Sequence, residues 1–379
     1  MQNYHVVYLS LGSNLGDKLS HLNDASQYIQ EDIGLIINSS EVYESPSWGY
    51  NSLSSFYNVI IKIHTHFKAP KLLKKIKKIE EKLGRKKNIE GFEDRIIDID
   101  IIDFNQEILN LENLIIPHKQ MEYRNFVLKP LADIHPNYIH PVSNKTIKQL
   151  LEETKDKNET IKTDKKLDFK TFHFSKLTNF LVIEGNIGAG KTTLTAKIGQ
   201  DFNAKMVFER YAENPFLPKF YKDQVRFAFP LEMSFLADRY QQVTDDLAQF
   251  DLFKDFIVSD YHIVKSLIFA KVTLQADEYK LYKSLFDIIY KDIPKPDLYL
   301  YLYRQTDNLF ENIKKRGRTY EKNIKKEYLE NINQGYLDHI NTNVDENILV
   351  LDVTGKDFIK NQKDYLWVIE KINDKLVDG

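Results

Sequence analysis

The sequence predicts two domains, an α+β sandwich followed by a parallel α/β domain. The chain has 379 residues, which suits two typical domains of roughly 100–200 residues each. Residues 185–192 read GNIGAGKT, the GxxxxGKT spacing of a phosphate-binding loop. A domain with such a loop usually begins with the strand before it. Here the loop lies halfway along the chain, so the first half needs a domain of its own.

A charged stretch at residues 152–166 marks the predicted boundary. Nearly all of its residues are charged or polar, so it is not expected to bury an apolar face. We therefore expect a first domain at residues 1–153, a charged linker at 154–175 and a second domain at 176–379. No internal repeat relates the two halves, so they are not a duplication.

The first half mixes strand-like and helix-like segments. Runs of β-branched and aromatic residues predict strands, and apolar residues at i, i+3 and i+4 spacing predict helices. The expected strands are 6–11, 36–43, 59–64 and 96–102, and the expected helices are 23–33 and 70–83. This order favours an α+β sandwich with helices packed on an antiparallel sheet.

The second half alternates between strands and helices. The expected strands are 180–183, 205–208, 256–259, 298–302 and 348–351, with helical stretches between them. Such alternation predicts a parallel five-stranded sheet with helices on both faces.

Composition excludes several classes of protein. The chain has no Cys, which rules out disulfides and thiolate metal sites. It has no signal-like N-terminus and no apolar run near the ~20 residues of a membrane span, so we expect a cytoplasmic protein without a membrane partner. The net charge of −2 argues against a nucleic-acid partner, although the lysine-rich helix at 70–83 keeps that alternative open.

The phosphate-binding loop predicts ATP and Mg²⁺ as cofactors. Its backbone N–H groups are expected to wrap the phosphates, with Lys191 reaching the β and γ oxygens and the Thr192 hydroxyl holding Mg²⁺. The expected ATP-binding residues are Gly185, Asn186, Ile187, Gly188, Ala189, Gly190, Lys191, Thr192 and Thr193. Further along, Arg316 and Arg318 could neutralise transition-state charge as lid arginines, or form an exposed basic helix end.

The half from about Lys176 resembles the deoxynucleoside kinases. The resemblance rests on the loop, on Glu209 after the second strand, on the sequences ENPF at 213–216 and FYKD at 220–223, and on Arg-x-Arg-x-x-Glu at 316–321. It implies that Glu209 is the general base for the sugar 5′-hydroxyl. It also implies that Tyr221 and Glu321 hold the 3′-hydroxyl, that Arg316 and Arg318 form the lid, and that this half forms a homo-oligomer.

Two positions depart from that family's pattern. Asp260 is present in the motif after the third strand and is expected to bind substrate, but Tyr261 stands where an arginine is usual. Either Lys265 or the lid arginines compensate for that arginine, or its phosphate contact is absent. Glu232 stands where a glutamine usually contacts the base. An ionised carboxylate only accepts hydrogen bonds. It therefore suits the exocyclic amino group of adenine or cytosine and repels the carbonyl of guanine or thymine, so we expect deoxyadenosine first and deoxycytidine as the alternative. Glu232 could instead pair with Arg239.

Asp98 and Asp100 are a candidate metal pair in the first half. Two residues apart on a strand, their side chains leave the same face, and paired carboxylates suit Mg²⁺ bridging a polyphosphate. The alternative is a pair of polar positions on an exposed sheet face.

The surrounding motifs resemble 6-hydroxymethyl-7,8-dihydropterin pyrophosphokinase, which implies a ferredoxin-like form of the sandwich. The motifs are LGSN at 11–14, YESP at 43–46, FYNV at 56–59, Arg-x-x-Asp-x-Asp at 95–100, IPH at 116–118 and the segment 124–131. The resemblance implies that Asp98 and Asp100 hold two Mg²⁺ ions. It implies further that Arg85, Lys87, Arg95 and His118 contact ATP, that Phe56 and Phe126 sandwich the pterin while Asn58 bonds its edge, and that Glu80 and Arg124 line the site.

This half also departs from its family. Phe92 stands where Trp is usual, Glu93 and Asp94 replace a Gly-Pro pair, and Lys87 replaces an arginine, which loses bidentate phosphate binding. Trp48 could close over the site as a lid. Two further alternatives stay open: a nucleoside monophosphate as acceptor in the second half, or one half that binds nucleotide without catalysis.

Overall fold

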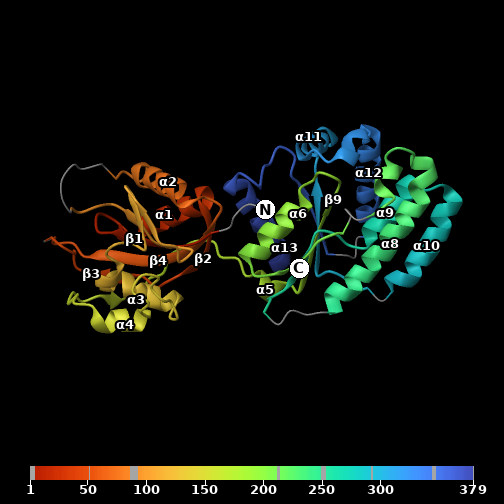
Figure 1. Ribbon diagram of the computed structural model, residues 1–379. Coiled ribbons are helices and arrows are strands. Elements are labelled where there is room, and N and C mark those ends of the chain that lie inside the picture. The colour runs from red at the N-terminus through yellow and green to blue at the C-terminus, as the bar shows by residue number, and fades with distance from the viewer. Residues whose placement is uncertain are drawn as a thin grey trace. The chain divides into compact units, whose positions relative to one another are not determined.

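The computed structural model describes residues 5–50, 52–85, 93–210, 214–248, 253–291, 293–343 and 347–378 (Figure 1). The chain divides into two compact units, Met1–Thr171 and Phe172–Gly379. None of the helices in these ranges is long and apolar enough to cross a membrane.

The first unit is built on an antiparallel sheet with strand order β5-β1-β4-β3-β8, in which β2 also pairs with β4. A separate hairpin, β6 (Leu109–Leu111) and β7 (Leu114–Ile116), lies outside that sheet. The strands of the main sheet are β1 (His5–Ser13), β2 (Gly34–Ser39), β3 (Tyr43–Ser45), β4 (Phe56–Thr65), β5 (Asp98–Phe104) and β8 (Ile161–Lys162).

Helices cover both faces of this sheet. On one face, α1 (Lys18–Asp32) and α2 (Ala69–Lys82) bury a core with alternate residues of the central strands. On the other, α3 (Asn125–Ile134) and α4 (Ile147–Glu153), together with the short helix η1 (Met121–Tyr123), pack over Tyr8, Ile60 and Ile102. The predicted α+β sandwich is confirmed.

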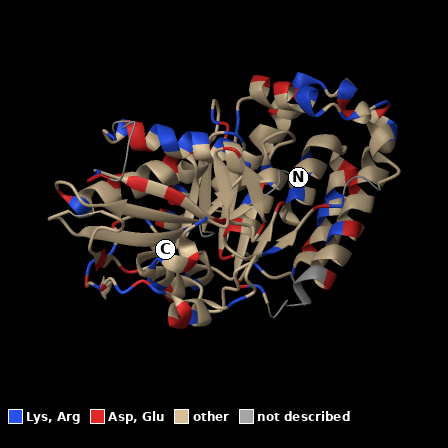
Figure 2. Ribbon diagram, turned by 60° about the vertical axis from the view of Figure 1, so that its left-hand side comes forward, with Lys and Arg blue, Asp and Glu red and all other residues tan. Residues whose placement is uncertain are grey.

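The helix α2 is amphipathic. Leu72, Ile76 and Ile79 are buried, while Lys71, Lys74 and Lys78 are exposed. Figure 2 shows Lys and Arg mainly on helices and loops, with the strands largely free of charge. The lysines therefore form a solvated helix face, which is the usual setting for such a run.

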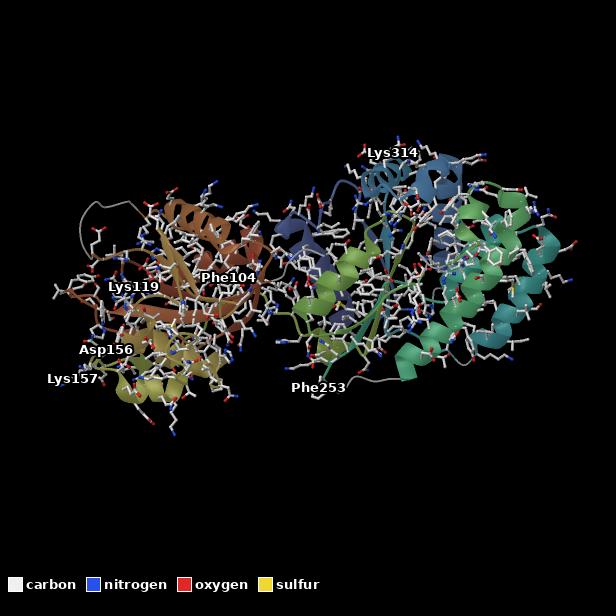
Figure 3. The ribbon with its side chains drawn as sticks, viewed as in Figure 1. Phe104, Lys119, Asp156, Lys157, Phe253 and Lys314 are labelled. Atoms are coloured by element: carbon white, nitrogen blue, oxygen red, sulfur yellow. The ribbon has the colours of Figure 1, made fainter. Side chains whose placement is uncertain are left out.

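The predicted linker is wrong over most of its length. Residues 154–171 belong to the first unit, where β8 pairs with β3 as an edge strand. Side chains from Thr163 to Phe169 alternate between partly buried and exposed, and Leu167 and Phe169 pack against the core under α1 and α2. Asp156 (Figure 3) accepts a hydrogen bond from the Asn125 N–H at the start of α3, at 2.9 Å. The boundary thus lies at 171/172.

The second unit contains a parallel sheet of order β10-β11-β9-β12-β13, which confirms the predicted five-stranded sheet. The strands are β9 (Phe180–Gly185), β10 (Lys205–Val207), β11 (Ile257–Ser259), β12 (Leu298–Tyr303) and β13 (Ile348–Asp352). Strand β9 has β11 on one side and β12 on the other. Strands β10 and β11 therefore lie on one side of β9, and strands β12 and β13 lie on the other. Ligands of open parallel sheets bind at such a point, beyond the carboxyl ends of the strands.

Helices flank this second sheet on both faces, α6 and α13 on one side of β9 and α8, α9 and α10 on the other (Figure 1). The other helices of the unit form its connections or precede its first strand. The helices are α5 (Phe174–Leu177), α6 (Lys191–Asp201), α7 (Leu217–Phe220), α8 (Gln224–Ala248), α9 (Val264–Thr273), α10 (Ala276–Tyr290), α11 (Thr306–Arg316), η2 (Thr319–Asn323), α12 (Lys326–Thr342) and α13 (Gln362–Asp378).

A fragment of residues 1–171 is expected to be more stable than one of residues 1–153. The shorter fragment loses β8, the Asp156 contacts and the packing of Leu167 and Phe169, which should cost at least ~2 kcal/mol of unfolding free energy. Thermal unfolding followed by circular dichroism measures the difference. Asp168→Ala in the longer fragment is the control, because that side chain is exposed and its replacement should leave the midpoint unchanged. Equal midpoints for the two fragments would contradict the assignment.

Two candidate active sites

A cavity of about 560 Å³ opens on the sheet face that carries α3, at the end of the strands where Gly12 pairs with Asn58 and Asp98. Seven of the residues singled out from the sequence line it together. They are Phe56, Asn58, Arg95, Asp98, Asp100, Arg124 and Phe126, and Ser10, Gly12, Ser45, Pro46, Trp48 and Tyr50 complete the wall.

Asn58 has a fixed orientation in the floor of this cavity. It is buried, and its Nδ2 donates to Ser45 Oγ at 2.9 Å. Its Oδ1 lies close to Gly12, where a Cβ would come within 3.2 Å of that oxygen. The glycine of the LGSN motif thus leaves room for the amide.

The aromatic side chains stand around a cation. The guanidinium of Arg124 lies 4.5 Å from the ring centroid of Trp48 and 5.5 Å from that of Phe126. Stacking a cation on aromatic faces is favourable. Trp48, which the sequence suggested as a lid, therefore forms part of the cavity wall through Arg124.

The two aspartates differ in their electrostatic surroundings. Asp98 accepts hydrogen bonds from Arg85 at 2.5 Å and from Arg95 at 2.6 Å. Burial alone would raise the pKa of Asp98, but these two arginines lower it below its ordinary value. Burial and the neighbouring Asp98 raise the pKa of Asp100 to about 6. His118 Nε2 lies 3.8 Å from Asp100, and burial lowers the pKa of this histidine to about 4.

Glu80 lies under the site instead of in its wall. It is 1% exposed, accepts from the Ile99 N–H at 2.8 Å and from Lys77 at 2.8 Å, and is ion-paired with Arg85. The geometry thus makes it a support for Arg85 and β5. Lys87 and Phe92 lie outside the described residues.

The donor set of this site suits Mg²⁺ shared with a polyphosphate. Asp98 and Asp100 offer hard oxygen ligands from one strand face, and Mg²⁺ usually takes one or two carboxylates together with substrate phosphates. Within the described residues no group of three His, Asp or Glu side chains could hold a metal by itself, so the phosphates would supply the remaining ligands.

In the second unit, the phosphate-binding loop joins β9 to α6. Lys191 Nζ donates to the carbonyl oxygens of Gly185 and Asn186 at 2.7 and 3.1 Å, so its ammonium lies inside the loop. Burial and the nearby Lys265 lower the pKa of Lys191 to about 8. Gly190 has φ +101°, and a Cβ there would meet the Phe358 ring at 2.8 Å. A side chain at this position would therefore deform the loop.

Asp260 connects the loop to the acceptor side. Its Oδ2 accepts from the Thr192 hydroxyl at 2.5 Å, and its Oδ1 accepts from the Glu209 N–H at 2.8 Å. The sequence predicted a substrate-binding role for Asp260. The geometry sets it beside Thr192, the expected Mg²⁺ ligand, where its carboxylate and that hydroxyl suit a hard cation.

Two buried cations hold Glu209. Arg239 donates to Oε1 at 3.0 and 2.5 Å, and Lys265 donates to Oε2 at 2.6 Å. Burial alone would raise the pKa of Glu209, but Lys265 and Arg239 hold it well below its ordinary value. Lys265 was one of the groups expected to compensate for the missing arginine at Tyr261. The contact of Arg239 with Glu209 was not predicted, because the sequence suggested only a pairing of Arg239 with Glu232.

Glu232 lies deep in the same region. It is 1% exposed, and its Oε1 accepts from the Thr273 hydroxyl at 3.1 Å. Within the described residues its Oε2 has no hydrogen-bond partner. Burial raises the pKa of Glu232 to about 7, although Arg239 and Thr273 lower it. Arg239 directs its guanidinium to Glu209 and Ser266.

The predicted lid arginines meet the predicted sugar ligand. Arg316 donates to both carboxylate oxygens of Glu321, at 3.1 and 2.5 Å, and Arg318 donates to one at 3.3 Å. Both arginines line a cavity of about 1630 Å³ together with Lys191 and Thr192. Tyr221 stacks on Tyr320, and burial and Glu321 raise its pKa. Tyr221 and Glu321 are thus neighbours, as the sequence expected.

In each unit, groups suited to phosphate and a metal ion lie close to further polar and aromatic side chains, an arrangement typical of phosphotransferases. A deoxynucleoside kinase model matches residues 181–378, and a 7,8-dihydro-6-hydroxymethylpterin-pyrophosphokinase model matches residues 8–136. The chain therefore belongs to both families and is a fusion of the two.

Individual relatives match each half. Deoxyguanosine kinase of Bacillus subtilis (strain 168) is 37% identical over 202 residues, which cover 52% of this chain and 98% of that protein. The 2-amino-4-hydroxy-6-hydroxymethyldihydropteridine pyrophosphokinase of Aquifex aeolicus (strain VF5) is 40% identical over 143 residues, 38% of this chain and 88% of that protein. A solved structure of deoxyadenosine kinase from M. mycoides with bound dCTP is 27% identical, with a TM-score of 0.45, over 52% of this chain and 99% of that one.

Lys265→Met is expected to create an acid limb in the pH profile of nucleoside phosphorylation. With both cations present the pKa of Glu209 is depressed, so the carboxylate stays ionised in mild acid. Without Lys265, less positive charge opposes the effect of burial, so the pKa of Glu209 rises. Activity should then fall as the pH drops through this raised pKa, because the carboxylate becomes protonated. The measurement is kcat/KM from about pH 4 to about pH 8, a range that spans the ordinary pKa of a glutamate, about 4.3.

Lys271→Met is the matched control, since Lys271 is exposed on the same helix. Superimposable profiles for wild type and Lys265→Met would show that Lys265 does not hold Glu209 in its ionised form.

Proposed function

We propose that the first unit transfers pyrophosphate from Mg-ATP to the hydroxymethyl group of 6-hydroxymethyl-7,8-dihydropterin. The observation that carries this is one cavity that joins a place for a flat polar ring to a place for a polyphosphate. Phe56, Phe126 and Asn58 offer the ring stacking and an edge hydrogen bond. Asp98, Asp100 and Arg95 offer metal and phosphate contacts beside them.

The second unit, in this proposal, transfers the γ-phosphoryl group of Mg-ATP to the 5′-hydroxyl of a deoxynucleoside. Glu209 lies beside the phosphate-binding loop, connected to it through Asp260. Its ionised carboxylate can accept the hydrogen bond of the 5′-hydroxyl and orient it. With a depressed pKa it is a weak base, which suffices because phosphoryl transfer is mainly positioning and charge neutralisation.

For the nucleoside, deoxyadenosine is the first candidate. The buried Oε2 of Glu232 can accept from the exocyclic amino group of adenine. Deoxyguanosine is the second, for two reasons. A relative 37% identical along the kinase half is named deoxyguanosine kinase, and a carboxyl group with a pKa of about 7 can also donate, which suits the guanine carbonyl. The sequence-based expectation that Glu232 rejects guanine is therefore weakened.

Each activity is expected to be lost separately. Asp98→Ala should reduce pyrophosphoryl transfer at least ~100-fold through lost metal and phosphate positioning, and leave nucleoside phosphorylation unchanged. Lys191→Ala should do the reverse. Both reactions are measured on the full chain with radiolabelled ATP, and the untouched activity of each variant is its control for folding. If either variant kept both activities, the site assignment would be wrong.

The base contact is tested with Glu232→Gln and the four deoxynucleosides. Glutamine both donates and accepts, so activity on deoxyguanosine and thymidine should rise relative to deoxyadenosine by roughly ten-fold in kcat/KM. Glu330→Gln, at an exposed position of α12, is the control. Unchanged ratios among the four substrates would mean that Glu232 does not contact the base.

A further inference from the structure

A polar cluster lies beside the cavity of the first unit and is not used by the function proposed above. Asp94 Oδ1 accepts from Asn14 Nδ2 at 2.6 Å and from the Tyr50 hydroxyl at 3.0 Å. The side chain of Ser52 also hydrogen-bonds to the Asp94 carboxylate. These four residues, named here the Asp94 cluster, come from three segments: the end of β1, the loop that follows β3, and the segment before β5.

Asn14 connects the cluster to the backbone of Arg95. It is 2% exposed, its Oδ1 accepts from the Arg95 N–H at 2.7 Å, and its own N–H donates to the Arg95 carbonyl at 3.1 Å. The same amide that holds the Asp94 side chain therefore also fixes the backbone of the next residue. Asp94 and Arg95 are thus positioned as a pair against the end of β1.

The cluster joins two segments that both line the cavity. Trp48 and Tyr50 come from the loop after β3, and Arg95 comes from the segment that leads into β5, which Asp98 begins. Arg95 Nη1 donates to Asp98 Oδ2 at 2.6 Å, so the position of Arg95 also affects the candidate metal pair. The Tyr50–Asp94 hydrogen bond, together with that of Ser52, connects the loop directly to the arginine segment.

The Asp94 cluster keeps the same charge state over the physiological pH range. Hydrogen bonds from Ser52, Asn14 and Tyr50 lower the pKa of Asp94, and burial together with Asp94 raises the pKa of Tyr50 to about 12. Asp94 is therefore an ionised acceptor and Tyr50 a neutral donor at any physiological pH. Such charge-assisted hydrogen bonds are stronger than neutral ones.

We propose that Asp94 is a positioning residue for pyrophosphoryl transfer. It holds the Trp48–Tyr50 loop against the Arg95 segment, and so sets the width of the cavity and the placement of Arg95. The inference rests on the proposed function of the first unit. A proline, usual at this position in the resembling family, has no side-chain acceptor, so this connection comes from the particular sequence of this chain.

The test combines kinetics with a spectroscopic measurement that needs no activity. The chain has two tryptophans, Trp48 and Trp367, so in a Trp367→Phe background the fluorescence reports the loop alone. Asp94→Ala and Tyr50→Phe are each expected to increase the quenching of Trp48 by acrylamide. Asp94→Ala is expected to raise the KM for the pterin roughly ten-fold, the effect of losing about 1.4 kcal/mol of hydrogen bonding, with a much smaller change in kcat.

The double variant shows whether Asp94 and Tyr50 act through their hydrogen bond to each other or through independent contacts. Because Asp94 and Tyr50 act on each other, Tyr50→Phe should add little to Asp94→Ala, in both quenching and KM. Asp24→Ala, an exposed carboxylate on α1, is the control and should change neither.

Unchanged quenching in Asp94→Ala, or fully additive effects in the double variant, would overturn the proposal. If the wild type showed no pyrophosphoryl transfer, the proposed function would fail, while the quenching series would still decide whether Asp94 holds the loop.

Discussion

Both sites depend on the same electrostatic constraint: a largely buried carboxylate has to stay ionised. Asp98 meets it with Arg85 and Arg95, and Glu209 meets it with Arg239 and Lys265. Removing a charge from water costs several kcal/mol, and a single cation rarely offsets that cost while leaving the geometry defined. Two cations arriving from different elements offset the desolvation and also fix the carboxylate in space. Two unrelated folds have reached this arrangement at the place where phosphate chemistry requires it.

Much of the fold could be predicted because its signals are local. The strand before Gly185, the loop itself and the alternation of strands and helices are patterns within short windows. The prediction of a linker at residues 154–175 rested on the high proportion of charged and polar residues. The burial of the side chains alternates, however: Thr163, Lys165, Leu167 and Phe169 are partly buried, and the residues between them are exposed. Alternation, more than average polarity, is the signal of an extended segment that packs one side against a core.

Site residues that belong to a sequence motif could be predicted. Contacts that depend on how distant elements pack could not. Phe56, Asn58, Asp98 and Phe126 converge as the resemblance implied. The contact between Arg239 and Glu209 joins residues 30 apart and depends on how α8 packs against α9, which no local pattern encodes. Glu80 was placed in the wall of the site, but its burial makes it a support for Arg85.

The two contacts of Asp260 have a consequence for how the kinase unit binds its two substrates. One carboxylate accepts from the Thr192 hydroxyl of the phosphate-binding loop and from the backbone N–H of Glu209, the residue proposed to bind the acceptor. A nucleotide that draws Asp260 toward a metal ion would alter the support of Glu209, and an acceptor that moves Glu209 would alter the metal ligand in return. Linkage requires these two effects to be equal in free energy. The two substrates of this unit would then not bind independently. The binding of each would change the affinity for the other through the Asp260 carboxylate.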